Sequence, residues 1–554
     1  MNRKEVSMKI TCEGKEYELF DGATPQTLWN MVRGGRDKNE AVLAEIGGNV
    51  IGFQTPFPSD GVVRWVSANS PKARRAYQRT LVMLLVCGVH EVYGKKIDVL
   101  IRHSLGKSLY CEFSDKHIPL QRELDELEKT MKNIVAEKRD ITQMAVGKKR
   151  AIAFLRMNGR IDDAALLSQM TTLSDLQVNQ CGPVIDYYLG PLFPDMGYVG
   201  EFRLRSYAPG FLIQISEPGE TAAKMEKEDP LFAKVFLESQ HWSELIGCRT
   251  LSELNQAIDD GQIHQLIAVA EALHEKKLAE LADAICHQDF PTRLVCIAGP
   301  SSSGKTTFMR RLIVHLWVHG AKPVMLSLDD YFKNREEMER KNWENLDAID
   351  LPLFESAVTD LLNGKEVYLP SFNFMTGKKE WSHTPVTLGE NQPILVEGLH
   401  ALNPQLTYFV PGYQCMHVYL SALTQIGINN HNRISTSDTR LLRRLVRDAR
   451  FRGNGAKHTL SVWDNVRKGE ERNIFHFQDR AEFIFNSALL YEIPVLKGIA
   501  LPLLNELMPK DPEYSEAQRL LHFLEPFRTL SIDAVPDHSL LREFIGQRRK
   551  VPLE

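Results

Sequence analysis

A glycine-rich segment between an apolar run and a helical pattern constrains the fold more than any other feature. Residues 299–306 read Gly-Pro-Ser-Ser-Ser-Gly-Lys-Thr and match G-x-x-x-x-G-K-[ST] at every fixed position. The five apolar residues before this segment, 294–298, are typical of a buried parallel strand. After it, apolar residues recur at helical spacing and Gly320 marks a helix stop (Phe308, Leu312, Leu316, Trp317). This order of strand, loop and helix predicts an α/β sheet with a phosphate site.

Each residue type in the segment has a physical role in binding phosphate. Glycines let the backbone curl so that successive N–H groups point at phosphate oxygens, at the positive end of a helix. Lys305 can reach the β- and γ-phosphates, and the Thr306 hydroxyl can ligate Mg²⁺. We therefore predict a nucleoside triphosphate site; the alternative is a Gly/Ser loop with an incidental lysine. The predicted contacts are Gly299, Pro300, Ser301, Ser302, Ser303, Gly304, Lys305, Thr306 and Thr307.

Two further apolar runs end in carboxylates. One run begins at Val324 and leads into Asp329 and Asp330, and the other begins at Pro393 and leads into Glu397. In an open α/β sheet the carboxyl ends of the strands meet over the ligand crevice. We therefore expect these carboxylates beside the loop. As an alternative, an aspartate here caps a helix, and Asp330 is the better candidate of the two.

Arginines are concentrated downstream, with seven of them between residues 433 and 452. They fall on a predicted helix and the loop after it. Guanidinium groups suit the spread negative charge of a transferring phosphate. For about half of these arginines, the alternative is a solvated helix face.

These segments, together with Leu-Pro-Ser-Phe-Asn-Phe at 369–374, resemble the uridine kinase/phosphoribulokinase family over residues 294–495. The resemblance implies a P-loop NTPase parallel sheet flanked by helices. It also implies transfer of the ATP γ-phosphate to a hydroxyl of a nucleoside or a related sugar-bearing molecule. ATP or GTP as the donor stays open.

The resemblance assigns roles to particular residues. Asp329 would orient or deprotonate the attacking hydroxyl, and Lys305, Arg447 and Arg452 would complete the catalytic set. Thr306 and Glu397 would serve Mg²⁺. The implied substrate contacts are Asp329, Tyr331, Phe372 and Arg444.

The chain departs from the family at three places. Family members that bind pyrimidine nucleosides carry a Tyr, and a His five residues later, in the segment matching 372–377, and this chain has neither. The family's Asp-rich substrate segment is represented only by Glu-Asn-Leu-Asp-Ala-Ile-Asp at 344–350, and Asn454 stands where the family has an arginine. The acceptor therefore stays open.

The N-terminal half carries a second resemblance. Residues 8–65 show strand-like alternation and turn signals, and we read the segment around Trp29 as another short strand. They resemble the TGS domain, the β-grasp module of threonyl-tRNA synthetase and some GTPases. Residues 70–215, the synthetase-like module, resemble that synthetase's second accessory domain in the segments 103–113 and 186–192. A helix is predicted over 120–137 from the spacing of Leu120, Leu124, Leu127, Met131 and Ile134.

In the synthetase, the second accessory domain hydrolyses mischarged tRNA with His and Cys side chains. The matching positions here are Tyr188 and Leu192, and the family's His-x-x-x-His pair is absent, with His90 and His103 standing alone. The resemblance therefore implies that editing chemistry is lost, while the fold persists as a binding or regulatory module.

The length of 554 residues predicts several domains, in a multidomain α/β and α+β chain. We expect a β-grasp domain (1–66), a synthetase editing-like domain (67–220), a helical connector (221–290), a P-loop kinase domain (291–500) and a C-terminal helical extension (501–554). The net charge of −4 argues against a globally basic nucleic-acid binder.

Eight scattered cysteines without C-x-x-C indicate reduced thiols, and the start has no apolar signal region, so we expect a cytoplasmic protein. The longest apolar run, 81–89, is too short for a membrane span. The expected partners are ATP, a small-molecule hydroxyl acceptor and, through the N-terminal modules, RNA; assembly into a homo-oligomer stays open. The alternative function is an RNA- or ribosome-associated regulatory NTPase.

Overall fold

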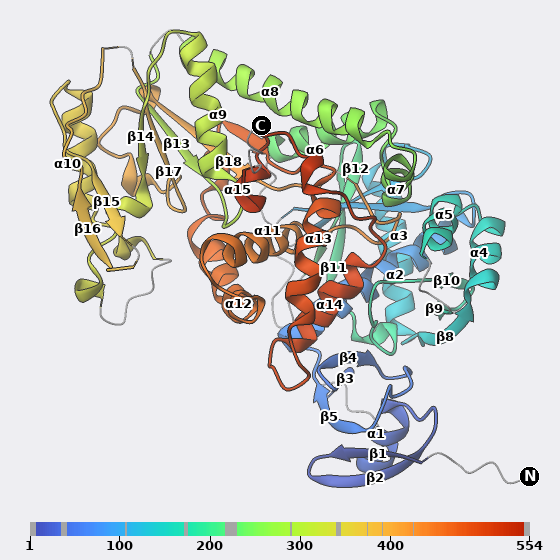
Figure 1. The fold of residues 1–554 in the computed structure, drawn as a ribbon. Helices are drawn as coiled ribbons and strands as arrows, with labels where there is room; N and C mark the ends of the chain where they lie inside the picture. The colour runs from blue at the N-terminus through green and yellow to red at the C-terminus, as the bar shows by residue number, and fades with distance from the viewer. Residues whose placement is uncertain are drawn as a thin grey trace, which may run out of the picture.

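The computed structural model places the two halves of the chain side by side, with the β-grasp module at one end and a parallel sheet at the other (Figure 1). The structure describes residues 7–34, 41–105, 108–170, 175–215, 230–287, 291–338, 345–373, 375–390, 392–424 and 426–547.

The first module is a five-stranded sheet in the order β2-β1-β5-β3-β4. Its central strands β1 and β5 are parallel and the other pairs are antiparallel. Our expectation of a strand around Trp29 was wrong, because this residue is buried on α1 (Pro25–Arg33). Thr24 caps this helix and Gly34 ends it in the left-handed conformation. The strands are β1 (Ser7–Cys12), β2 (Lys15–Phe20), β3 (Leu43–Ile46), β4 (Asn49–Gly52) and β5 (Gly61–Val66).

The synthetase-like module contains a four-stranded sheet (β11-β12-β7-β6) and a three-stranded antiparallel sheet (β10-β9-β8). The predicted amphipathic helix is confirmed as α3 (Gln121–Ala136), whose Leu124, Leu127, Met131 and Ile134 are fully buried. Leu120 is the N-cap instead and is 54% exposed. The strands are β6 (Val99–Leu105), β7 (Ser108–Phe113), β8 (Thr142–Gly147), β9 (Asp175–Cys181), β10 (Val184–Asp186), β11 (Phe202–Tyr207) and β12 (Gly210–Ile215).

Helices pack around and beyond these sheets. The module's other helices are α2 (Arg74–Tyr93), α4 (Lys148–Met157) and α5 (Ile161–Gln169). Three helices lead to the second half: α6 (Pro230–Leu245), α7 (Leu251–Asp259) and α8 (Ile263–Cys286). The long α8 lies along α9 (Lys305–Val318), where Arg311 donates to Glu275 at 2.7 Å (Figure 1).

The second half is built on a five-stranded parallel sheet in the order β14-β17-β13-β18-β19. Alternate residues of β13 enter two different cores, with Val295 and Ile297 on one face and Leu294, Cys296 and Ala298 on the other. This burial on both faces explains the continuous apolar run and confirms the α/β fold class. The strands are β13 (Leu294–Ala298), β14 (Val324–Ser327), β17 (Ile394–Gly398), β18 (Cys415–Ser421) and β19 (Phe483–Asn486).

A small hairpin and five helices complete this half. The hairpin pairs β15 (Pro370–Asn373) with β16 (Lys378–Trp381). The helices are α10 (Leu351–Leu362), α11 (Thr436–Phe451), α12 (Ala456–Asn473), α13 (Glu492–Asn505) and α14 (Tyr514–Leu524), and a one-turn helix α15 (Arg542–Ile545) follows.

Two general expectations can be compared with the structure. All eight cysteines are free thiols, and six of them are buried. Among the described residues, no helix is both long and apolar enough to cross a bilayer.

Candidate active site

The glycine-rich segment forms a tight loop between β13 and α9, as its sequence predicts. Ser302 and Gly304 have φ values of +60° and +94°, in the left-handed region that lets the loop curl. A Cβ on Gly299 would lie 2.6 Å from the Leu420 carbonyl oxygen, so only glycine fits against β18. Lys305 folds back over the loop, and its Nζ donates to the Gly299 carbonyl at 2.8 Å. The strand and helix thus fix the loop, and the lysine stands at its centre.

Arginines of α11 hold this loop from the side. Arg440 donates to both carboxylate oxygens of Glu470, at 2.6 and 2.8 Å, and to the Ser301 carbonyl at 3.1 Å. Glu470 in turn accepts the Ser301 backbone N–H at 2.8 Å. Arg443, which is 0% exposed, donates to Glu492 at 2.5 Å and to the carbonyls of residues 302 and 303. For these two arginines, the alternative of a solvated helix face is wrong.

The three arginines assigned to phosphate or substrate share one buried carboxylate. Asp448 is 1% exposed and pairs with Arg444 at 3.3 Å, Arg447 at 3.0 Å and Arg452 at 3.7 Å. Arg444 also donates to the Ser301 hydroxyl at 2.9 Å. Sequence reasoning missed both Asp448 and Glu470. For Asp448 the signal was present, because it stands four residues after one of these arginines and four before another.

Asp329 is exposed on the turn that follows β14, at the carboxyl end of the sheet, where the ligand crevice of an open α/β sheet lies. Burial by the crevice walls raises the pKa of its carboxyl and Asp330 raises it further, whereas Lys305, Arg452 and Arg447 act in the opposite direction. These attractions show that the fold brings the loop lysine and two of the arginines around Asp329. The three cations of the predicted catalytic set therefore lie close enough to Asp329 to act on its charge.

The neighbours of Asp329 have structural partners. Asp330 accepts the Phe372 backbone N–H at 3.1 Å and so holds β15 against the turn. The Phe372 ring lies edge-on to Phe332 at 5.7 Å and is 6% exposed. Tyr331 is 1% exposed and packs edge-on against Phe354, 5.3 Å away, in the core rather than in the crevice. Of the implied substrate contacts, the structure thus places Tyr331 and Phe372 as packing residues.

Glu397 lies at the end of β17, directly beside β13 and β14 in the sheet. It is 8% exposed and accepts the Ser327 hydroxyl at 3.1 Å. Burial, and then Asp329, raise its pKa to about 7, although Lys305 lowers it. Two crowded carboxylates beside the first turn of α9, which carries Thr306, form a donor set of hard oxygens that fits a divalent cation such as Mg²⁺.

The segment matching the family's substrate region is only partly described. Glu344, Phe374 and, in the synthetase-like module, Lys107 lie outside the described residues. Asp350 caps α10 by accepting the Leu353 N–H at 3.3 Å and pairs with Lys379 at 2.6 Å. This aspartate therefore has a structural role.

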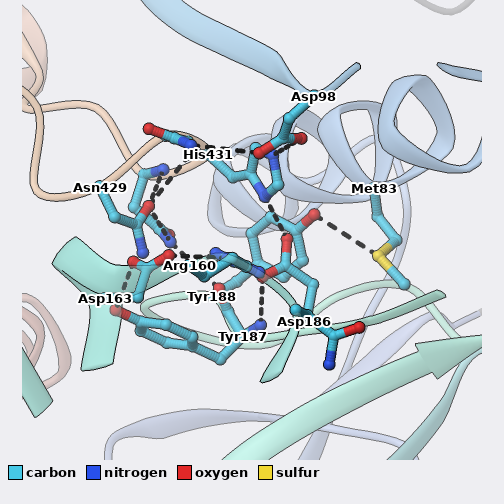
Figure 2. Close-up of polar contacts among 12 residues, drawn as sticks. Met83, Asp98, Arg160, Asp163, Asp186, Tyr187, Tyr188, Asn429 and His431 are labelled. Carbon is cyan, nitrogen blue, oxygen red and sulfur yellow. Dashed lines mark hydrogen bonds and ion pairs between the residues drawn. The ribbon is translucent and has the colours of Figure 1, made fainter. Parts of the chain in front are cut away.

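The synthetase-like module is packed at the two positions that the sequence resemblance aligns with editing residues. Tyr188 and Leu192 are 6% and 5% exposed, and the Tyr188 hydroxyl donates to the Met83 sulfur at 3.4 Å (Figure 2).

A histidine from the other half of the chain enters this region. His431 contacts Asp186 at 2.5 Å through Nδ1 and Asp98 at 2.9 Å through Nε2 (Figure 2). Burial alone would lower the pKa of His431, but the two carboxylates raise it to about 10, so the ring carries a proton. Arg160 completes the cluster by donating to Asp186 and, at 2.6 Å, to Asp163. Every charge in the cluster is paired.

Residues next to His431 add hydrogen bonds between the two halves of the chain. The Ile101 N–H donates to the Asn430 carbonyl at 2.8 Å, and the Asn432 side chain binds the Tyr187 carbonyl at 3.1 Å and the Leu189 N–H at 3.2 Å. Sequence reasoning missed this contact, because His431 is separated from Asp186 by 245 residues and belongs to no motif.

In comparisons with known proteins, the two halves of the chain match different groups of proteins. Residues 294–490 match the model of the Phosphoribulokinase / Uridine kinase family. The uridine kinase of Staphylococcus haemolyticus is 28% identical over 182 residues, covering 32% of this chain and 78% of that protein. Among solved structures, D-glycerate 3-kinase from Cryptococcus neoformans is 17% identical with a TM-score of 0.25, over 40% of this chain and 88% of that one.

The N-terminal half matches threonine–tRNA ligases. The ligase of Syntrophotalea carbinolica is 24% identical over 200 residues, or 36% of this chain. The match covers 31% of that ligase, so the chain spans about a third of its length.

Proposed function

We propose that residues 291–500 form an ATP-dependent kinase that transfers the γ-phosphate to a hydroxyl of a nucleoside or a related sugar-bearing molecule. The observation that carries this proposal is the convergence of Lys305, Arg447 and Arg452 on Asp329 at the end of β14. A hydrolase needs only to position water. A carboxylate surrounded by phosphate-binding cations in a crevice is suited to an acceptor hydroxyl.

In this proposal, the loop amides and Lys305 bind the triphosphate, and the arginines offset charge on the transferring group. Asp329 accepts the proton of the acceptor hydroxyl, while the oxygen of that hydroxyl bonds to the γ-phosphorus. The bond from that phosphorus to the β,γ-bridging oxygen breaks, and ADP leaves. Thr306 and Glu397 would hold Mg²⁺, which supplies charge neutralisation along the phosphates.

The test is to incubate the protein with labelled ATP and a panel of nucleosides and sugars, and in a second arm with tRNA. We expect a labelled acceptor. Asp329→Asn should reduce its formation roughly 100- to 10,000-fold, because proton transfer to a positioned base contributes that much. Lys305→Ala should abolish both transfer and nucleotide binding.

The matched control is Asp330→Asn, because the amide oxygen can still accept the Phe372 N–H and the residue is adjacent in sequence. It should stay within a few-fold of the parent rate. Acceptor-independent hydrolysis stimulated by tRNA would overturn the proposal and favour the alternative, a regulatory NTPase that binds RNA through its N-terminal modules.

A further inference from the structure

The last described residues of the chain fold onto the phosphate-binding loop. We call residues 532–546 the C-terminal cap; its helix α15 packs against α11 and lies beside the first turn of α9 (Figure 1). Arg542 is 4% exposed and donates to the carbonyls of Ile532, Pro536 and Gly546 at 3.1 to 3.2 Å. These bonds tie both ends of the cap to one buried guanidinium, so the cap is a compact unit.

A carboxylate of the cap occupies a phosphate-binding amide. Glu543 Oε2 accepts the Thr307 backbone N–H at 3.0 Å. This N–H belongs to the first turn of α9, whose amides have no partner within the helix and attract anions. A phosphate at Thr307 and the Glu543 carboxylate therefore compete for one donor.

A leucine of the cap covers the loop itself. A Cβ placed on Gly304 would lie 2.4 Å from Leu540 Cδ2, so the Leu540 side chain rests directly on the loop backbone. Leu540 is 1% exposed. An apolar side chain at this position offers no hydrogen bond to phosphate oxygens.

An aromatic ring stands beside the carboxylate. Phe544 lies 5.1 Å from the guanidinium of Arg443, the arginine that binds loop carbonyls. Ser539 contacts the Tyr491 hydroxyl at 3.0 Å, and Arg450 donates to the Ile545 carbonyl. The cap thus presents a carboxylate to the α9 amide and a ring to an arginine that holds the loop.

From these contacts we propose that the C-terminal cap is an intramolecular competitor of the nucleotide, so that this conformation is autoinhibited. This inference rests on the proposed function, in which the loop binds ATP. Nucleotide entry requires Glu543 to leave the Thr307 amide and Leu540 to leave Gly304. The apparent affinity is reduced by the small fraction of molecules in which the cap is displaced.

Binding of a non-hydrolysable ATP analogue with Mg²⁺ to the full chain tests the competition. Glu543→Gln removes the charge and Leu540→Ala removes the bulk. Each should tighten the apparent Kd by about tenfold. In Glu543→Gln a neutral amide oxygen accepts the Thr307 N–H more weakly than a carboxylate does, and in Leu540→Ala less apolar surface covers the loop. Glu506→Gln, at an exposed site after α13, is the matched control and should leave the Kd unchanged.

A second measurement follows the cap directly in the parent protein. Addition of the analogue should increase amide hydrogen exchange in residues 541–546, whose N–H groups are bonded within the cap. An unchanged or weaker Kd in both cap variants, with binding still lost in Lys305→Ala, would overturn the inference and leave the proposed function intact. If neither the parent nor any variant bound the analogue, both proposals would fail. Binding by the cap variants alone would support both.

Discussion

The phosphate loop and the synthetase-like module both match families with known chemistry, yet they treat their charges in opposite ways. At the loop, Asp329 and Glu397 crowd together and have raised pKa values. In the module, Asp186 and Asp98 have lowered pKa values, because Arg160 and the protonated His431 pair with them. Two crowded carboxylates beside cationic side chains point to an external ligand, whereas a closed set of pairs supports the structure. The difference separates the proposed active site from a region whose charges hold the two halves of the chain together.

The two regions are connected through α11. The segment that carries His431 leads directly into this helix. In the first turn of the helix, the Asp438 carboxylate accepts hydrogen bonds from Arg519 at 2.8 Å and from Arg75 at 3.4 Å. Arg75 belongs to the N-terminal half of the chain, where it lies on α2. The N-terminal half therefore holds the start of the arginine helix at two points, and the arginines of the crevice lie further along the same helix.

The largest effect should come from breaking the paired region with His431→Gln. The substitution leaves the buried Asp186 and the partly exposed Asp98 without their shared cation, and loss of one partner of a buried ion pair typically costs about 3 kcal/mol or more. Because the chain folds around several separate sheets and cores, a local measurement is required. The Ile101 amide, which donates to Asn430, should exchange its hydrogen at least 100-fold faster, as about 3 kcal/mol corresponds to that ratio.

The exposed His458 provides the matched control, and His458→Gln should leave this exchange rate unaltered. Equal rates in His431→Gln and the parent would mean that the cluster does not hold the two halves together. In that case the contrast between the two regions would lose its energetic basis.

A smaller effect should follow from raising the pH of the unaltered protein. The pKa of His431 rises from 6.5 to about 10 on folding, so its contribution is complete below pH 6.5 and is lost towards pH 10. The pKa of Asp98 falls from 3.8 to about 2 on folding, so its contribution to stability is present above pH 3.8 and is lost towards pH 2. Opening at Ile101, corrected for the intrinsic exchange rate, should grow between pH 7 and 10. In His431→Gln this alkaline increase should vanish; its persistence would assign it to another group.

The sequence predicted what is encoded locally. The loop, its strand and its helix occupy consecutive residues, and periodicity alone located α3, whose four buried residues repeat along one face. The contacts that the sequence did not predict join segments that are far apart in the chain. Glu470 meets Ser301 across 169 residues, and Glu543 meets Thr307 across 236. No spacing rule links such pairs, because they form only when helices pack against the sheet.

The smallest effect, no detectable activity, is expected when Tyr188→Cys is combined with Leu192→His. The two substitutions restore the residue types of the editing motif, but the upstream His-x-x-x-His pair is still missing. The site is also closed, since the 429–432 segment bonds to Tyr187 and Leu189 on either side of Tyr188. Mischarged tRNA incubated with excess protein should therefore lose its amino acid at the uncatalysed rate. Faster release that required both substitutions would show that the packed region still admits an aminoacyl end, and it would remove the contrast with the phosphate crevice.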